Sequence, residues 1–142
     1  MKDKPTRSEY KVFYPITTRW MDNDLYGLVN NVTYYSYFDT AVNLCLIEEG
    51  SLDPLSASVV GYVVASECNY HSPVGYPDRL EVGLRVDKLG NSSAKYGVAV
   101  FRQGELVASA HGHSIHVFVD RTVSKSVPVP TSIRRALEKI LV

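Results

Sequence analysis

The sequence predicts an α+β domain in which an antiparallel sheet packs against one long helix. From Val32 to Glu49, small polar residues recur every three or four positions among apolar ones, the period of a mostly buried helix. From Leu80 to Asp87, apolar and polar residues alternate, the period of a strand with one buried face. Further strand-like segments with turn residues between them follow, so a single sheet accompanies a single long helix.

Composition limits the classes of protein that this chain can be. Its 142 residues, 45% of them hydrophobic, fit one domain spanning residues 1–142. Fifteen basic and fifteen acidic residues cancel, so no overall field favours nucleic acid as a partner. No apolar run approaches the roughly 18 residues of a membrane span. Cys45 and Cys68 are too few for a disulfide framework, so we expect a cytoplasmic protein.

The first elements are a strand and the long helix. A β-branched and aromatic segment from Tyr10 to Trp20 predicts the strand. Asn30 or Asn31 can cap the start of the helix. Gly50 can end it in a left-handed conformation. Both ends of the helix are therefore marked in the sequence.

Four strands and a short helix follow. The strands are expected at Val59–His71, Leu80–Asp87, Ser93–Arg102 and Leu106–Val119, in an antiparallel meander. Thr131 is expected to cap an amphipathic terminal helix. The order is thus strand, helix, four strands, helix.

The last strand has small residues on one face, which allow another backbone or a helix to approach closely. These residues are Ala108, Ala110, Gly112 and Ser114. One long helix cannot cover both faces of a five-stranded sheet. The remaining apolar face or edge therefore predicts self-association, as a homodimer or homotetramer.

Polar residues are densest between the first strand and the helix, in the run Arg19 to Ala41. Here the backbone NH groups and positive end of the helix dipole lie beside Asp24. A carbonyl oxygen polarised by NH groups around Asn31 would lie within reach of that carboxylate. From the residues alone, the favoured interpretation is that Asp22, Asp24 and the asparagines are only turn and cap residues, which these residue types most often are.

This run resembles the signature of the hot-dog-fold acyl-CoA thioesterases, in particular the 4-hydroxybenzoyl-CoA thioesterase-like group. The family pattern is roughly DxDxxGHVNNxxYxxYxE, and the matching residues are Asp22, Asp24, Gly27, Val29, Asn30, Asn31, Tyr34 or Tyr35, and Asp39. The segments HSPVGYPDRLEV and HVFVDRTVSKSVPVP resemble later parts of the family. The resemblance covers nearly the whole chain and implies a hot-dog fold, with a five-stranded sheet wrapped around the helix.

The resemblance also implies an activity, hydrolysis of an acyl-CoA thioester to a free acid and CoA. Asp24 takes the place of the catalytic aspartate, as nucleophile through a mixed anhydride or as general base. The backbone NH at Asn31 takes the place of the group that polarises the carbonyl. No cofactor is implied, because CoA enters as part of the substrate. The implied substrate-binding residues are Gly27, Val29, Asn30 and Tyr35.

The chain departs from the family pattern at two positions. Leu28 stands where the family commonly has His, and Asp39 stands where Glu is frequent. Asp39 is a candidate second catalytic carboxylate on the helix, but we interpret it as a structural hydrogen-bonding residue. Because Leu28 replaces this His, a second possible function is that of a noncatalytic protein that binds acyl thioesters. A third is that of a thioesterase that acts on acyl carrier protein. A hot-dog dehydratase would need a catalytic His in this loop or helix, and neither contains one.

Two other groups of residues were considered as sites, the histidines of the last strand and the pair of Cys68 and His71. His111 and His113 share one face of a strand and His116 points to the other, so a third metal ligand is missing and no metal site is expected. Cys68 and His71 lie three positions apart in a strand, on opposite faces, which argues against a Cys–His nucleophile.

Coenzyme A carries phosphates, for which basic residues and turn NH groups are the expected partners. The candidates are Lys88, Ser93, Arg121 and Lys125. In this fold the site normally lies between protomers, so these residues can act on the substrate of a partner chain. The identity of the acyl group stays open.

Overall fold

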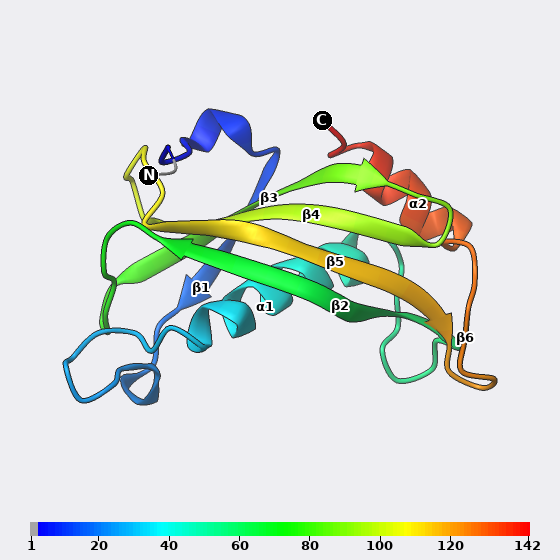
Figure 1. The fold of residues 1–142 in the computed structure, drawn as a ribbon, viewed down its shortest axis with the longest axis horizontal. Coiled ribbons are helices and arrows are strands. Elements are labelled where there is room, and N and C mark those ends of the chain that lie inside the picture. The colour runs from blue at the N-terminus through cyan, green and yellow to red at the C-terminus, as the bar shows by residue number, and fades with distance from the viewer. Residues whose placement is uncertain (1–2) are drawn as a thin grey trace.

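The computed structural model describes residues 3–142, in which a curled antiparallel sheet holds a long helix against one face (Figure 1). The predicted α+β class is confirmed. The strands are β1 (Val12–Thr17), β2 (Val59–Tyr70), β3 (Arg79–Leu89), β4 (Ser93–Arg102), β5 (Ala110–Asp120) and the two-residue β6 (Lys125–Ser126). The helices are α1 (Thr33–Glu48), α2 (Thr131–Glu138) and the short 3-10 helices η1 (Arg7–Glu9) and η2 (Trp20–Asp22).

The strand order corrects one prediction. Along the sheet the order is β1-β3-β4-β5-β2, with β6 beside β5, and all pairs are antiparallel. Strands β3, β4 and β5 form the predicted meander, but β2 pairs with β5 and not with β3, so a four-strand meander was wrong. The connection at residues 71–78 is long enough to carry the chain across the sheet, whereas a meander needs a short turn.

Helix α1 forms because one of its sides is apolar along its whole length. The buried side chains recur at spacings of three and four and face the inner side of the sheet. They are Tyr34, Tyr37, Phe38, Ala41, Val42, Cys45 and Leu46. No helix described in residues 3–142 is long and apolar enough to cross a membrane.

The ends of the helices differ in detail from the prediction. The N-cap of α1 is Val32, whose NH donates to Asn30 Oδ1 at 3.1 Å, so Asn30 acts at the start of the helix from two residues earlier. The left-handed residue after α1 is Ser51, with φ of 58°, and not Gly50. Gly50 is needed for space, because a Cβ there would lie 2.8 Å from the Leu46 carbonyl oxygen. Helix α2 begins at Thr131 with Pro130 as its N-cap.

The small residues in and before β5 do not form one continuous packing surface for the helix. Ala108 precedes the strand and packs in a separate cluster with Tyr10 and Phe101, because regular pairing starts only at Ala110. At Gly112 the close neighbour is the backbone of β2, since a Cβ would lie 1.9 Å from the Glu67 carbonyl oxygen. The predicted close approach of another backbone is therefore confirmed at Gly112, where the neighbour is a strand and not a helix, whereas Ala108 lies outside the strand.

Candidate active site

The loop between β1 and α1 forms a small hairpin that presents Asp24. Asn23 and Val29 pair as an isolated antiparallel bridge, and the Asp24 NH donates to the Leu28 carbonyl at 2.8 Å. Gly27 turns the chain with φ of +78°, a conformation that favours glycine. The loop closes through the backbone of Leu28, so its closure does not depend on a histidine side chain at that position.

Asp24 is half-buried and lines an open hollow of about 840 Å³. Its Oδ1 accepts a hydrogen bond from the Tyr26 NH at 2.9 Å and a longer one from the Leu28 NH at 3.4 Å. These bonds fix the carboxylate relative to its own turn. The other residues around the hollow are Trp20, Asn23, Leu25, Gly27, Asn30 and Tyr76.

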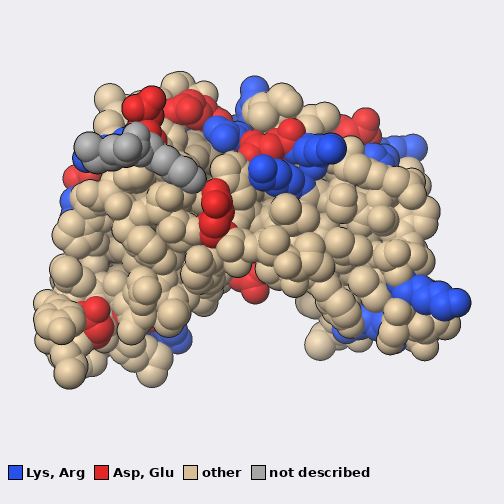
Figure 2. All heavy atoms as spheres, in the orientation of Figure 1, with Lys and Arg blue, Asp and Glu red and all other residues tan. Residues whose placement is uncertain are grey.

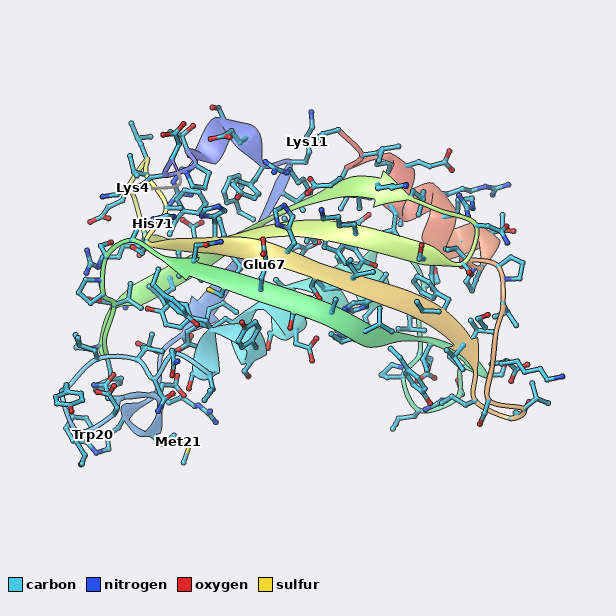
Figure 3. The ribbon with its side chains drawn as sticks, in the orientation of Figure 1. Lys4, Lys11, Trp20, Met21, Glu67 and His71 are labelled. Atoms are coloured by element: carbon cyan, nitrogen blue, oxygen red, sulfur yellow. The ribbon has the colours of Figure 1, made fainter. Side chains whose placement is uncertain are left out.

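Exposed apolar side chains surround this hollow. Trp20 and Met21 project from η2 at the lower left of Figure 3, away from the sheet. The Trp20 ring meets the Tyr76 ring edge-on, with 6.0 Å between their centroids. Leu25 and Tyr26, next to Asp24, are also exposed. Such a concentration of exposed apolar residues on one loop is typical of a surface that contacts a ligand or another chain.

The structure brings together some of the predicted site residues and separates others. Asp24, Gly27 and Asn30 share the hollow. Asn31 is exposed at the start of α1, where its carbonyl accepts from the Tyr70 hydroxyl at 3.0 Å. Val29 is buried, and its NH donates to the Val74 carbonyl at 2.9 Å. Val29 therefore anchors the loop to the core.

Tyr35 lies elsewhere, on a second hollow of about 540 Å³ between α1 and strands β2 and β5. This hollow is also lined by Asp39, which is exposed. The interaction that joins Asp39 to Asn43 uses the Asp39 backbone carbonyl, which accepts from Asn43 Nδ2 at 2.8 Å. The structural role that we expect for the Asp39 carboxylate therefore stays a prediction.

The candidate CoA-binding residues lie toward the other end of the sheet. Lys125 pairs in β6 at the right of Figure 1, whereas the loop before α1 lies at the left. The Arg121 guanidinium donates to the carbonyls of Pro54 and Ala57, so it ties down the loop before β2. Within one chain these residues do not meet Asp24. Lys88 is exposed at the end of β3 and Ser93 begins β4 near the same end.

The residues that sequence reasoning missed are Arg19 and Tyr37, which surround Asp22. The Asp22 side chain is only 2% exposed and accepts hydrogen bonds from both. Burial opposes ionisation of Asp22, but hydrogen bonds from Arg19 and Tyr37 outweigh it and hold the pKa of the carboxyl below its usual range. Asp22 could have been singled out because the motif contains two aspartates. Nothing in the sequence indicates that Asp22 bonds to Tyr37, fifteen residues later.

The described histidines do not converge on a metal site. His71 Nε2 lies 2.7 Å from His111 Nδ1, with the rings stacked. Within residues 3–142, no group of three or more His, Cys, Asp or Glu side chains is arranged to hold a metal ion. As predicted, His111 and His113 share the outer face and His116 lies on the inner one.

The chain was compared with models of known protein families. The model of the thioesterase superfamily matches residues 26–109, more than half of the chain. The chain belongs to the thioesterase superfamily. The match starts within the loop that carries Asp24 and includes all of α1. The expected family and hot-dog fold are therefore confirmed.

Several solved structures are similar to this chain. The PA5185 protein from Pseudomonas aeruginosa strain PAO1 is 52% identical, with a TM-score of 0.97 over 98% of this chain and 97% of that chain. The PA2801 protein from the same species is 33% identical, with a TM-score of 0.78 over 87% and 95%. Slr0204, a 1,4-dihydroxy-2-naphthoyl-CoA thioesterase from Synechocystis, is 17% identical, with a TM-score of 0.79 over 88% and 93%, a likeness of fold alone.

Proposed function

We propose that this chain hydrolyses an acyl-CoA thioester to a free carboxylic acid and CoA, with Asp24 as the catalytic carboxylate. The observation that carries the proposal is the position of Asp24 on an open hollow beside Asn30, at the start of α1, in a chain of the thioesterase superfamily. The Synechocystis neighbour acts, by its name, on a CoA thioester. For this chain we propose only the same type of scissile bond, a CoA thioester, and not the same acyl group.

Two chemistries fit a carboxylate in this position. As general base, Asp24 takes a proton from water while the water oxygen attacks the carbonyl carbon. The C–S bond then breaks, and the CoA thiolate leaves and is protonated. As nucleophile, an Asp24 oxygen attacks the carbonyl, releases the thiolate and forms a mixed anhydride that water cleaves. In both, backbone NH groups around Asn31 stabilise the oxyanion, aided by the helix dipole.

The decisive experiment compares two aspartates with the same local geometry. Asp24 Oδ1 accepts from the NH two residues later, and so does Asp53 Oδ1 in the exposed loop before β2, at 3.0 Å from the Leu55 nitrogen. An asparagine can keep the accepting oxygen in either turn but lacks the charge. We expect Asp24→Asn to lower kcat by at least about a hundredfold, and Asp53→Asn to leave it unchanged, in a thiol-release assay over a panel of acyl-CoAs.

The same panel separates the alternatives. Near-native kcat in both Asp24→Asn and Asp24→Ala would remove Asp24 from the mechanism. Saturable binding of CoA esters by the wild-type chain without thiol release would indicate a noncatalytic binding protein. Release of thiol from acyl carrier protein only would identify the carrier thioester as the substrate. Single turnover in ¹⁸O-labelled water distinguishes the chemistries, because solvent oxygen in Asp24 requires the anhydride.

We further propose that the active unit is a homodimer or homotetramer assembled through β2. Among the described strands, only β5 pairs with β2, so one of its edges is open. Tyr62, Val63 and Val64 on this strand are each about half-exposed. Figure 2 shows that the hollowed lower face of the molecule, over β2 and α1, has few charged side chains. An open, apolar edge of this kind favours pairing with another strand.

Sedimentation measurements test the assembly. The wild-type chain is expected to sediment as a dimer or tetramer, and Val64→Lys, which places a charge on the open edge, as a smaller species. A wild-type monomer at micromolar concentration would contradict the proposal.

Cys45 and Cys68 are both free thiols in the structure, which supports a reducing compartment such as the cytoplasm.

A further inference from the structure

We infer that Asp22 and Tyr37 are positioning residues, which hold the loop that presents Asp24 in register with the start of α1. This inference rests on the proposed function, since it assigns a role around the same site. Neither residue lines the hollow that contains Asp24, so neither is a catalytic residue. Their effect is exerted through the loop backbone.

The Asp22 carboxylate is fully used by hydrogen-bond donors. Oδ1 accepts from Arg19 Nε and Nη2 at 3.1 and 3.0 Å, and Oδ2 accepts from the Arg19 backbone NH at 2.9 Å. The Tyr37 hydroxyl, from α1, donates to the same Oδ2 at 2.8 Å. Each oxygen thus accepts two bonds, which restrains both the position and the rotation of the carboxylate.

The same residue is also bonded to the far side of the loop. The Asp22 carbonyl accepts from the Asn30 NH at 2.9 Å. Asp22 therefore joins the start of the loop to its end through the backbone, and to the second turn of α1 through Tyr37. Asp24, two residues later, lies inside the segment closed by these links. A displacement of Asp22 would therefore also displace Asp24 and Asn30, two of the polar residues that line the hollow.

The ion pair between Arg19 and Asp22 alone does not explain this arrangement. The Arg19 side chain is 64% exposed, and an exposed partner contributes little to stability. The buried hydrogen bond from Tyr37 is the link to the helix, because the Tyr37 ring is packed in the core on the inner side of α1. Removing the Tyr37 hydroxyl leaves the apolar ring in place and breaks only this link.

The chain contains a reporter of the loop and a matched control. Trp20 is its single tryptophan and lies in η2 between Arg19 and Asp22. Tyr96 is a second buried tyrosine, and its hydroxyl has no hydrogen-bond partner among the described residues. Tyr37→Phe and Tyr96→Phe therefore remove the same atom from two buried tyrosines, but only the first removes a link to the loop.

The test combines Trp20 fluorescence with kinetics. We expect Tyr37→Phe to change the Trp20 emission and to lower its anisotropy, and to reduce kcat by about tenfold to a hundredfold with KM within twofold of wild type. Asp22→Asn should have the same effect or a larger one, since its NH2 group would face a donor. Tyr96→Phe should match wild type in both measurements, and circular dichroism should show all variants folded.

The outcomes separate this inference from the proposed function. Unchanged Trp20 emission and kcat in Tyr37→Phe would overturn the inference, and so would equal losses in Tyr37→Phe and Tyr96→Phe. If the wild-type chain released no thiol, the proposed function would fail, and Trp20 fluorescence would still decide whether Tyr37 fixes the loop. If Asp24→Asn lost activity and Tyr37→Phe did not, only the positioning role would be wrong.

Discussion

Two histidines of β5, three residues apart, lie in opposite environments. His113, on the outer face, has Nδ1 3.0 Å from Glu67 Oε1 and Nε2 3.0 Å from Asp87 Oδ2. His116, on the inner face, is 2% exposed, and neither of its ring nitrogens has a hydrogen-bond partner among the described residues. Its closest ring neighbour is Tyr96, edge-on at 4.9 Å between centroids.

The difference shows how a sheet with one covered face distributes polar groups. On the outer face, Gly97 of β4 leaves room for Arg85 and Asp87 of β3, because a Cβ at Gly97 would lie 2.7 Å from Arg85 Nε. Asp87 can therefore reach His113 across an intervening strand. On the inner face α1 covers the sheet, Tyr96 packs in the apolar core, and the buried His116 ring lies edge-on against Tyr96. Of these two histidines, His113 on the outer face has carboxylate oxygens at 3.0 Å, whereas no ion pair of His116 is found within residues 3–142.

The largest effect is expected at the glycine of β5 that lies against β2. In Gly112→Ala the new Cβ would meet the Glu67 carbonyl oxygen at 1.9 Å, and no side-chain rotation can relieve a contact with backbone. We expect a loss of more than about 4 kcal/mol in the free energy of unfolding, measured by urea denaturation.

Gly97→Ala is the matched control on the outer face. Its Cβ would lie nearest to side-chain atoms of Arg85 and Asp87 and not to backbone atoms, and side chains can move aside more easily than backbone. The expected loss is about 1 to 3 kcal/mol. Equal losses in the two variants would show that the backbone contact between β5 and β2 is not the more stringent one.

Local patterns in the sequence were sufficient for most of these elements. The spacing of buried residues in α1, the alternation in β3 and the turns between β3, β4 and β5 all involve neighbouring residues, and these predictions were confirmed. The place of β2 was not predictable from hairpin signals, because its pairing with β5 joins residues about forty to sixty positions apart. A close backbone approach at Gly112 was predicted from its small size, but the approaching strand, β2, follows from that long-range pairing and was not.

The candidate site divides in the same way. Asp24, Gly27 and Asn30 are close in sequence, and the structure places them on one hollow. The bond between Asp22 and Tyr37 depends on how the loop folds back on α1, which no spacing specifies. The position of the CoA phosphates would also depend on a second chain if the site lies between protomers. The catalytic and substrate-binding assignments accordingly stay predictions.

The next expected effect is a pH dependence of stability from the inner face. Burial lowers the pKa of His116, although the Asp39 carboxylate opposes this shift. The unfolded chain, with a histidine pKa of about 6.5, then binds a proton at a higher pH than the folded chain. The stability from neutral His116 is full above that pH and is lost as the pH falls toward the folded pKa, by at most about 1.4 kcal/mol per pH unit.

His116→Leu removes the titrating group and should flatten this dependence. Urea denaturation at pH 7.5, 6.5 and 5.5 measures the slope. Burial and the Lys4 charge also lower the pKa of His71, so a smaller slope of the same sign should remain. His71→Gln is the control that should keep the part due to His116. An unchanged slope in His116→Leu would contradict the assignment of acid sensitivity to the inner face.

The smallest effect is expected from the partnered histidine on the outer face. His113 faces a carboxylate from each of its ring nitrogens, but the Glu67 side chain is 53% exposed, and exposed ion pairs are largely offset by solvation. In a double-mutant cycle of Glu67→Gln and His113→Gln we expect a coupling free energy below about 1 kcal/mol, decreasing further with salt. A coupling that exceeded this and persisted in high salt would mean that the outer network is shielded from solvent, as it would be if another protomer covered this face. The cycle therefore also reports whether assembly is confined to the open edge of β2.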